Sequence, residues 1–288
     1  YYDETNLMDI KVVGTLGLTE DDVAAIRQVD GVENAEGAYG TDVMCGEGEK
    51  QKVLHVEAVN QTMNRISVTE GKVPEKSGEI FLDCIFAESN GYKVGDQIIL
   101  KEGGDSELLK KTDYTVVGLG ESPLYISYNR GNSTLGSGEV NGFAYVLHED
   151  FDQEVYTQIY VQAHGAQDLI SYTDAYDSLI ERVQERVEGI EAERCQVRYD
   201  EIVEEANEKL ADARQELEDG KKEADEKLAD ARQELEDGEK KLKDGKKEYK
   251  DGKKKLADAR KELEDGKAQL VDAKKELEDG RSQLASAK

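Results

Sequence analysis

The chain has 288 residues, of which 37% are hydrophobic and 36% are charged, so a compact core cannot extend through all of it. Residues 1–200 carry 38 acidic and 16 basic side chains, a net charge of −22, whereas the last 88 residues carry 27 and 22, a net charge of −5. This balance excludes a nucleic-acid partner and a long-range attraction to anionic lipid headgroups, because both need a basic surface.

No run of about 18 apolar residues is present, so no segment of this sequence is expected to span a bilayer. The sequence has neither an initiator methionine nor a signal-like start, and we expect it to be a piece excised from a longer protein. The three cysteines, Cys45, Cys84 and Cys195, are too far apart for a CxxC metal site and allow one disulfide at most.

The first part of the chain predicts a β-α-β-β unit in which one helix packs on one face of a sheet. A strand is expected over 7–15, followed by a helix with Thr19 as N-cap, Asp22 three residues later and Gly31 as its stop. Further strands are expected over 34–45 and 52–59.

The middle of the head, up to residue 199, is rich in predicted strands. They are expected over 79–82, 97–100, 114–119, 142–147, 157–163 and 194–199, and a helical turn over 85–89 ends at the Asn90-Gly91 pair. The stretch 127–142 has the composition of an exposed loop, and apolar spacing predicts a helix over 167–188.

Three phrases of the head carry a resemblance to a known family. They are LMDIKVVGTLGLTEDDVAAIRQVDGVENAEGAYGTDV, then GKVPEKSGEIFLD with AESNGYKVGDQIIL, and finally DYTVVGLGES. In this order they resemble the extracytoplasmic core domain of MacB-type, FtsX-like ABC transporter permeases. The resemblance covers about 7–199.

The resemblance implies an α+β head of two lobes, a porter-like lobe from 1–64 and 157–199 and an inserted, strand-rich Sabre-like lobe from 65–156. It also implies membrane helices outside this sequence, a cognate cytoplasmic ATPase subunit as partner, and a position on the extracellular face of the cell membrane. The long tail differs from Gram-negative members of the family. It resembles the coiled-coil insertions of Gram-positive FtsX-like permeases and the Leu-x-x-Gly repeats of YhgE/Pip-type membrane proteins.

The tail, 200–288, predicts a heptad coiled coil, because a large residue recurs every seven positions and a small one follows it by three. An earlier set at Leu210 and Leu217 joins this register through a stutter before Leu228. We call the predicted interface the seam; it consists of Leu228, Ala231, Leu235, Gly238, Leu242, Gly245, Tyr249, Gly252, Leu256, Ala259, Leu263, Gly266, Leu270, Ala273, Leu277, Gly280 and Leu284.

Glycine costs about 1 kcal/mol relative to alanine inside a helix, and a buried leucine returns about 1.5–3 kcal/mol only if another surface covers it. The small seam residues therefore predict close approach of a second helix. No reversing turn follows residue 199, so the partner helix is expected from a second copy or from sequence beyond residue 288.

No motif predicts a catalytic residue, a cofactor or a bound metal. His55, His148 and His164 are isolated, Ser137 lacks a nucleophile elbow, and the repeated Asp-Gly pairs lack the further oxygens of a calcium loop. Tyr125, Tyr128 and Tyr145 either line a binding surface or are half-buried strand residues.

These observations predict a non-enzymatic extracellular module that relays ATP-driven motion to a peptide substrate, a lipoprotein or a cell-wall hydrolase. One alternative is an adhesion or scaffold protein whose coiled coil serves as a spacer. Another is a secreted hydrolase, which would require Asp, His and Ser to cluster in a cleft of the middle lobe.

Overall fold

The computed structural model of the chain describes residues 2–46, 48, 51–102 and 108–286. The chain divides into two compact units, Tyr1–Val203 and Glu204–Lys288, which we call the head and the tail. The structure is α+β, with a strand-rich head and a long C-terminal helix, and this confirms the predicted fold class.

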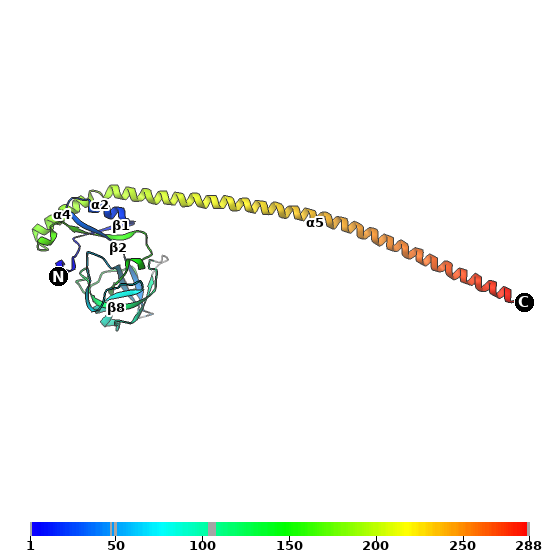
Figure 1. The fold of residues 1–288 in the computed structure, drawn as a ribbon, viewed down its shortest axis with the longest axis horizontal. Coiled ribbons are helices and arrows are strands. Elements are labelled where there is room, and N and C mark those ends of the chain that lie inside the picture. Colours follow the sequence, from blue (N-terminus) through cyan, green and yellow to red (C-terminus); the bar gives the residue numbers. More distant parts are fainter. Residues whose placement is uncertain (1, 47, 49–50, 103–107, 287–288) are drawn as a thin grey trace. The chain divides into compact units, whose positions relative to one another are not determined.

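A three-stranded antiparallel sheet forms the first part of the head (Figure 1). It has the order β1-β10-β2, with β1 at Ile10–Leu18, β10 at Tyr156–Ala163 and β2 at Val32–Ala38. A short helix, α1 (Tyr2–Thr5), precedes it, and a 3₁₀ turn, η3 (Ala166–Asp168), follows β10.

Two helices, α2 (Glu20–Arg27) and α4 (Asp174–Glu188), pack on one face of this sheet. Successive side chains of a strand point to opposite faces, so Ile159 and Val161 of β10 face the helices whereas Tyr160 faces away from them. The fully or nearly buried members of this core are Val23, Ile26, Ala35, Ile159, Val161, Ala163, Ala166, Val183 and Val187.

The N-terminus of α2 forms as the sequence predicts. The Thr19 side chain accepts a hydrogen bond from the backbone N–H of Asp22, and the Asp22 carboxylate accepts one from the backbone N–H of Thr19 at 2.7 Å. This capping box satisfies two backbone donors that the helix itself cannot pair.

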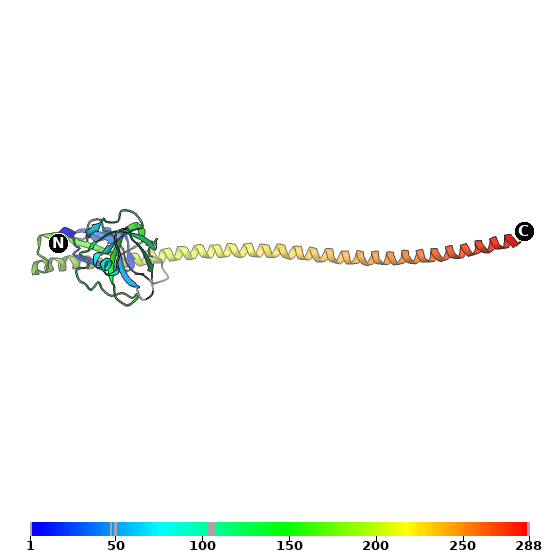
Figure 2. The same ribbon diagram turned by 90° about the horizontal axis from the view of Figure 1, so that it is seen from below.

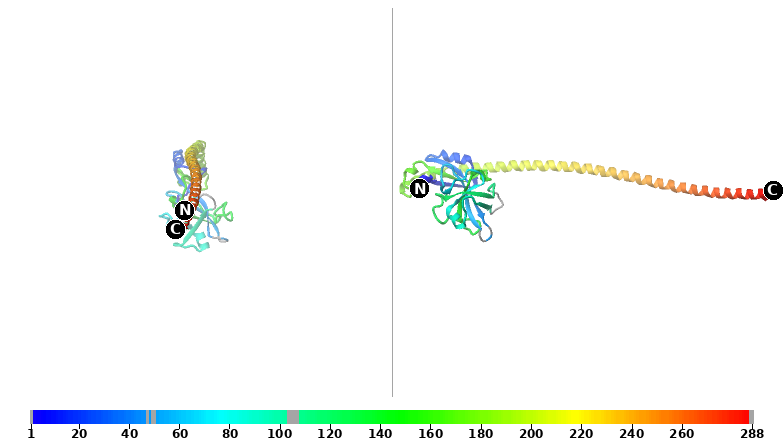
Figure 3. Two further views of the ribbon diagram at one scale, coloured as in Figure 1. Left: turned by 90° about the vertical axis from the view of Figure 1, so that its right-hand side faces the viewer. Right: turned by 60° about the horizontal axis from the view of Figure 1, so that its bottom comes forward.

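A seven-stranded sheet forms the second part of the head, with the order β5-β8-β6-β9-β4-β3-β7. The strands are β3 (Gly40–Cys45), β4 (Lys52–Ala58), β5 (Ser67–Gly71), β6 (Glu79–Asp83), β7 (Gln97–Glu102), β8 (Asp113–Glu121) and β9 (Gly142–Val146). A further pairing of β7 with β8 closes the sheet into a barrel, and β5 pairs with the other half of the same β8 edge (Figure 3).

The barrel has its own apolar core, separate from that of the three-stranded sheet, and α3 (Cys84–Asn90) packs against it. Asp83 caps α3 through its carboxylate, and Gly91 ends the helix in the left-handed conformation at φ 78°. The turn predicted at Asn90-Gly91 is therefore confirmed.

Several elements of the head differ from the prediction. The single strand expected over 34–45 is two strands in different sheets: Ala38 pairs with Gln158 of β10, whereas Gly40 pairs with Glu57 of β4. No proline or turn dipeptide marks this change at Tyr39, so the sequence pattern looks continuous. Strand β5 was not predicted, and the helix expected from residue 167 begins at Asp174 after the 3₁₀ turn.

The strand predicted over 194–199 is wrong, because these residues belong to helix α5 (Glu191–Ser286). Alternating apolar residues suggested a strand, but no helix breaker separates them from the tail, and the helix runs through. Helix α5 has 96 residues. Figure 2 shows it as one unbroken helix. At 1.5 Å per residue its axis is about 144 Å long.

The lobe boundary expected between residues 64 and 65 stays a prediction. Strands β3 and β4, which were assigned to the porter-like lobe, pair within the seven-stranded sheet. Within the described residues, no helix is both long enough and apolar enough to cross a membrane.

Candidate functional site: the long helix and its anchorage in the head

The first turns of α5 are fixed to α2 by an ion pair. Arg194 Nε donates a hydrogen bond to Asp22 Oδ1 at 2.7 Å, and the Asp22 side chain is only 5% exposed. The same carboxylate takes part in the capping box of α2, so one buried group orders the start of α2 and holds the start of α5. A hydrogen bond to a charged group of this kind contributes about 1.5–3 kcal/mol.

Arg198, one helical turn further along, lies on the same side of α5 as Arg194. Its Nε donates to the backbone oxygen of Leu16 in β1 at 3.4 Å, and its Nη1 pairs with Glu201 at 3.1 Å. Val187 and Ile190, at the turn from α4 into α5, pack in the core of the three-stranded sheet. These contacts make the beginning of α5 part of the head rather than a free extension.

The structure places the seam residues along the outer surface of α5 in the tail. Every large seam residue is exposed, from 55% for Leu228 to 73% for Leu284. Their side chains are thus largely open to solvent, and the seam remains a predicted interface. Its large residues are Leu228, Leu235, Leu242, Tyr249, Leu256, Leu263, Leu270, Leu277 and Leu284.

The tail glycines have no role in the single helix. A Cβ atom added at any of them would meet nothing within 4 Å, so no close contact within the tail requires glycine there. These positions are Gly220, Gly238, Gly245, Gly252, Gly266 and Gly280. Relative to alanine they cost the isolated helix on the order of 5 kcal/mol in total.

Two rows of charged residues follow the same seven-residue spacing as the seam. Aspartate follows every large seam residue except Leu284 by two positions, at Asp230, Asp237, Asp244, Asp251, Asp258, Asp265, Asp272 and Asp279. A basic residue follows by four positions, except at Glu239; the basic ones are Arg232, Lys246, Lys253, Arg260, Lys267, Lys274, Arg281 and Lys288. The basic row lies directly beside the large seam residues, at the position that faces a partner in a coiled coil.

A buried carboxylate joins the two sheets of the head. Glu57 of β4 is 3% exposed and accepts hydrogen bonds from Tyr125 at 3.0 Å and from Tyr160 of β10 at 3.1 Å. Burial, together with the nearby Glu57 carboxylate, raises the pKa of Tyr125 and of Tyr160 well above the usual value. Both hydroxyls therefore stay protonated and act as donors, which links the sheets through a polar cluster.

The close pairing of Asp42 and His55 is relevant to the alternative in which the protein is a secreted hydrolase. His55 Nδ1 lies 2.6 Å from Asp42 Oδ1, and Ser133 also hydrogen-bonds to Asp42. Burial raises the pKa of Asp42, but the bonds from His55 and Ser133 outweigh it and hold that pKa below its usual value. The Nε2 of His55 faces Glu57 at 3.5 Å and not a hydroxyl, so this cluster lacks the nucleophile–base contact of a hydrolase.

The other titratable residues singled out in the sequence are dispersed. His148 lies in the 3₁₀ turn η2 (His148–Asp150) and not in a strand, whereas His164 is 81% exposed. All three cysteines are free, and burial raises the pKa of Cys45 to about 11. Among the residues that the structure describes, no three His, Cys, Asp or Glu side chains are grouped to hold a metal ion.

The three tyrosines near the predicted loop have different environments. Tyr125 stacks on Phe143 with ring centroids 4.7 Å apart, and Tyr145 is buried with its hydroxyl 2.7 Å from that of Ser122. Tyr128 is 89% exposed. Two of the three therefore pack in the head, and the third is available at its surface.

Comparison with solved structures finds transport proteins. The chain is similar to the extracellular domain of the noncanonic ABC-type transporter YknZ from Gram-positive bacteria, with 15% identity and a TM-score of 0.32, over 58% of this chain and 80% of that one. It is also similar to the periplasmic region of MacB from Actinobacillus actinomycetemcomitans, with 11% identity and a TM-score of 0.34, over 61% and 76% of the two chains.

A third similar structure is a domain of a permease protein from Porphyromonas gingivalis, with 14% identity and a TM-score of 0.32, over 59% and 78% of the two chains. No protein-family model matches the sequence, and no curated protein matches it.

Proposed function

We propose that this chain is the extracellular module of an ABC transporter permease and that it relays ATP-driven motion outward through α5. A cognate cytoplasmic ATPase would move the membrane helices, and the head and tail would transmit that movement to a peptide substrate, a lipoprotein or a cell-wall hydrolase. In this proposal the module itself performs no chemistry.

One observation carries the proposal: α5 is unbroken over 96 residues and its first turns are bonded into the head. A displacement of the head is then passed to the helix through the Arg194–Asp22 pair and the packing around Ile190. A flexible spacer would need no such attachment, because a Gly- or Ser-rich linker would separate two parts at lower cost.

The seam supports a helical partner for the tail. Exposed leucines at heptad spacing are stabilised only when another surface covers them, and glycines that meet nothing in the single helix leave room for close approach. A helix that gains this contact is stiffened, which a mechanical relay requires.

The flanking charges favour a distinct helix over a second copy. In an antiparallel pair of identical tails the basic rows would face each other. In a parallel pair, attractive contacts such as Glu262 with Lys267 are offset by repulsive ones such as Lys255 with Arg260. A partner helix with an acidic row would match the basic row along its length.

The competing function is a surface adhesin or scaffold in which the tail only sets a distance. The experiment that separates the two uses the intact membrane protein with its ATPase. Residues 204–286 are deleted in one variant, and in a matched variant three seam leucines, Leu242, Leu256 and Leu270, are replaced by lysine at unchanged length.

A relay predicts that ATP hydrolysis persists in both variants while substrate release or partner activation is lost in both. A spacer predicts that the full-length lysine variant behaves as wild type. If neither variant changes substrate release or partner activation, the relay proposal is wrong.

A further inference from the structure

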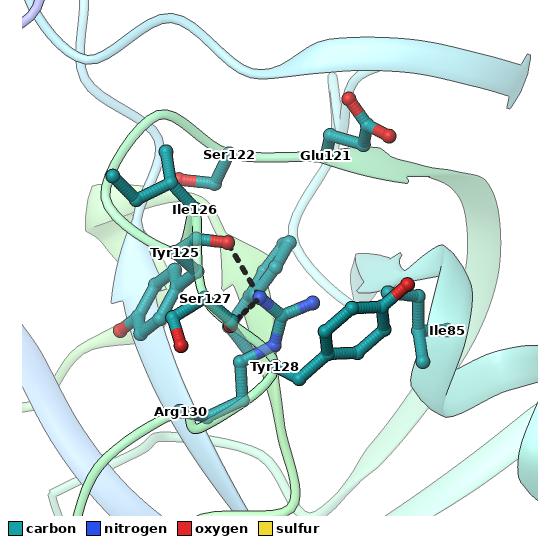
Figure 4. Close-up of a pocket in the computed structure, with 9 residues that line it drawn as sticks. Ile85, Glu121, Ser122, Tyr125, Ile126, Ser127, Tyr128 and Arg130 are labelled. Atoms are coloured by element: carbon teal, nitrogen blue, oxygen red, sulfur yellow. Dashed lines mark hydrogen bonds between the residues drawn. The ribbon is translucent and has the colours of Figure 1, made fainter.

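The loop 122–131 of the barrel is organised around a buried arginine. The Arg130 side chain is 7% exposed, its Nε donates to the buried Asp83 carboxylate at 2.9 Å, and one face of its guanidinium lies over Phe143 at 5.4 Å. Its Nη1 donates to the backbone oxygens of Tyr125 and Ser127 (Figure 4). Three of its five N–H donors are thus used to hold the loop in place.

The remaining terminal nitrogen of Arg130, Nη2, has no hydrogen-bond partner among the described residues, and Figure 4 shows bonds at only one of the two terminal nitrogens. Nη2 is also not among the fully buried unpaired atoms, so it reaches open space. That space is a pocket of about 290 Å³. A pair of N–H donors, fixed by an otherwise buried side chain, therefore faces the pocket.

Three exposed side chains add apolar surface to the lining of this pocket. Tyr128 is 89% exposed, Ile126 is 63% exposed, and Ile85 at the start of α3 is 41% exposed. Tyr128 stands out because an exposed tyrosine beside exposed aliphatic residues is typical of binding surfaces. Glu121, at the end of β8, adds a carboxylate to the lining.

The charges of the pocket define what it would accept. The buried Asp83 already neutralises Arg130, so Nη2 offers two donors without a net positive charge. The carboxylate of Glu121 and the net charge of −22 over residues 1–200 both disfavour an anion. The ligand that matches this pocket has a neutral oxygen that accepts hydrogen bonds. It also carries an apolar group and a positive charge near that oxygen.

We propose that this pocket binds a cationic, apolar peptide segment. A backbone carbonyl oxygen of the peptide accepts from Nη2 of Arg130, an apolar side chain packs against Tyr128 and Ile126, and an amine lies near Glu121. The volume of the pocket suits one or two residues of a peptide, so the site binds a short segment of a longer peptide. This inference rests on the proposed function, because it names the class of ligand that an extracellular module of a transporter would bind.

The test measures binding directly by titration calorimetry on the 288-residue chain. The probe is the amidated tripeptide Leu-Leu-Lys, with acetyl-Leu-Leu-Glu as the acidic counterpart and hexylamine as a cation without carbonyl groups. The site variants are Tyr128→Ala, Ile126→Ser and Glu121→Gln, and Arg130→Lys keeps the charge beside Asp83. The matched control is Ile170→Ser, because Ile170 is 79% exposed and lies outside the pocket.

We expect the lysine tripeptide to bind and the other two probes to bind at least about tenfold more weakly. Tyr128→Ala and Ile126→Ser each weaken binding about tenfold, as loss of an anchor does, and Ile170→Ser leaves it unchanged. Since Tyr128 and Ile126 are exposed, these variants keep the fold even if Arg130→Lys loosens the loop.

The proposal is overturned if the lysine tripeptide does not bind, if its binding is unaffected by Tyr128→Ala and Ile126→Ser, or if the acidic tripeptide or hexylamine binds equally well. These outcomes are independent of the relay. A relay that fails while the tripeptide still binds would overturn the proposed function and leave the site in place.

Discussion

At the scale of single residues, the carboxylate of Glu57 is the point at which the two sheets of the head meet. It has few alternatives to its two tyrosine donors, because it is 3% exposed. Removing one donor leaves a buried carboxylate oxygen and the Gln158 amide without the hydroxyl of Tyr160.

We predict that Tyr160→Phe lowers the free energy of unfolding by about 1–3 kcal/mol, the cost of leaving a buried polar group unpaired. Urea unfolding followed by near-ultraviolet circular dichroism measures this change. Tyr128→Phe is the control, since that hydroxyl is on an exposed side chain and its loss should change stability by less than about 0.5 kcal/mol. Equal stability of both variants would mean that Glu57 does not join the sheets.

His148 makes the stability of the head depend on pH. Burial lowers its pKa below the usual 6.5, and the nearby Glu36 opposes this only in part. Its buried Nε2 has no hydrogen-bond partner among the residues that the structure describes. The folded state therefore binds the proton more weakly than the unfolded state. The contribution of neutral, buried His148 to the free energy of unfolding is fully present above pH 6.5. It is lost as the pH falls below that value toward the lower pKa of the folded state.

We predict that the wild-type chain loses more unfolding free energy between pH 8 and pH 5.5 than His148→Gln does. Urea unfolding at the two pH values gives the comparison, and the carboxylates and other histidines cancel in the difference. An identical loss in both proteins would show that His148 does not contribute.

At the scale of elements, the start of α5 illustrates where sequence patterns mislead. The alternation of Cys195, Val197 and Tyr199 predicted a strand, yet Arg194 and Arg198, four residues apart, bind the head as one face of a helix. Their partners, Asp22 and Leu16, are more than 170 residues away, so no local pattern could have revealed these contacts.

We predict that Arg194→Met, which keeps the apolar stem of the side chain, lowers the free energy of unfolding of the head by about 1.5–3 kcal/mol. It should also increase amide hydrogen exchange over 191–203. Lys227→Met is the control, because the Lys227–Glu223 pair is exposed and contributes about 0.3–0.5 kcal/mol. Unchanged exchange over 191–203 would contradict the anchorage.

Two variants of a single tail glycine test whether the small seam residues receive a closely packed partner helix. Gly245→Ala and Gly245→Leu both favour the helix, by up to about 1 kcal/mol. Only leucine adds bulk where a close partner would lie. We predict that, in the intact protein, alanine maintains or increases hydrogen-exchange protection of the tail and leucine lowers it.

If leucine increases protection as much as alanine does, the small seam residues do not receive a closely packed helix. The same comparison at Gly252 should repeat the result, because the two glycines occupy equivalent seam positions one heptad apart.

At the scale of the whole molecule, local signals predicted most strands of the head and the helical character of the tail, and the family resemblance implied the α+β fold class. Caps such as Thr19 and stops such as Gly91 act within a few residues, so they can be read in sequence. The change of sheet at Tyr39 and the Glu57 cluster depend on long-range pairing, and the sequence carries no local sign of either.

The pocket at Arg130 could not be predicted from the sequence either. The stretch 127–142 was predicted as an exposed loop from its composition, and Tyr128 does lie exposed in it. The buried Arg130 within the same stretch is held by Asp83, 47 residues earlier in the chain. Only the fold brings the two together.

In the proposed relay, the tail's seam receives another helix. Its most direct test places a photo-crosslinking residue, benzoylphenylalanine, in the intact protein in its membrane. The seam positions are Leu242, Leu256 and Leu270, and the matched outward positions, five residues after a large seam residue, are Lys247, Lys261 and Lys275. Mass spectrometry of the crosslinked peptides identifies the partner.

We predict helical crosslinks from all three seam positions and few from the outward ones, with a partner segment that carries an acidic row. Equal crosslinking from both sets, or none from the seam, would contradict the claim.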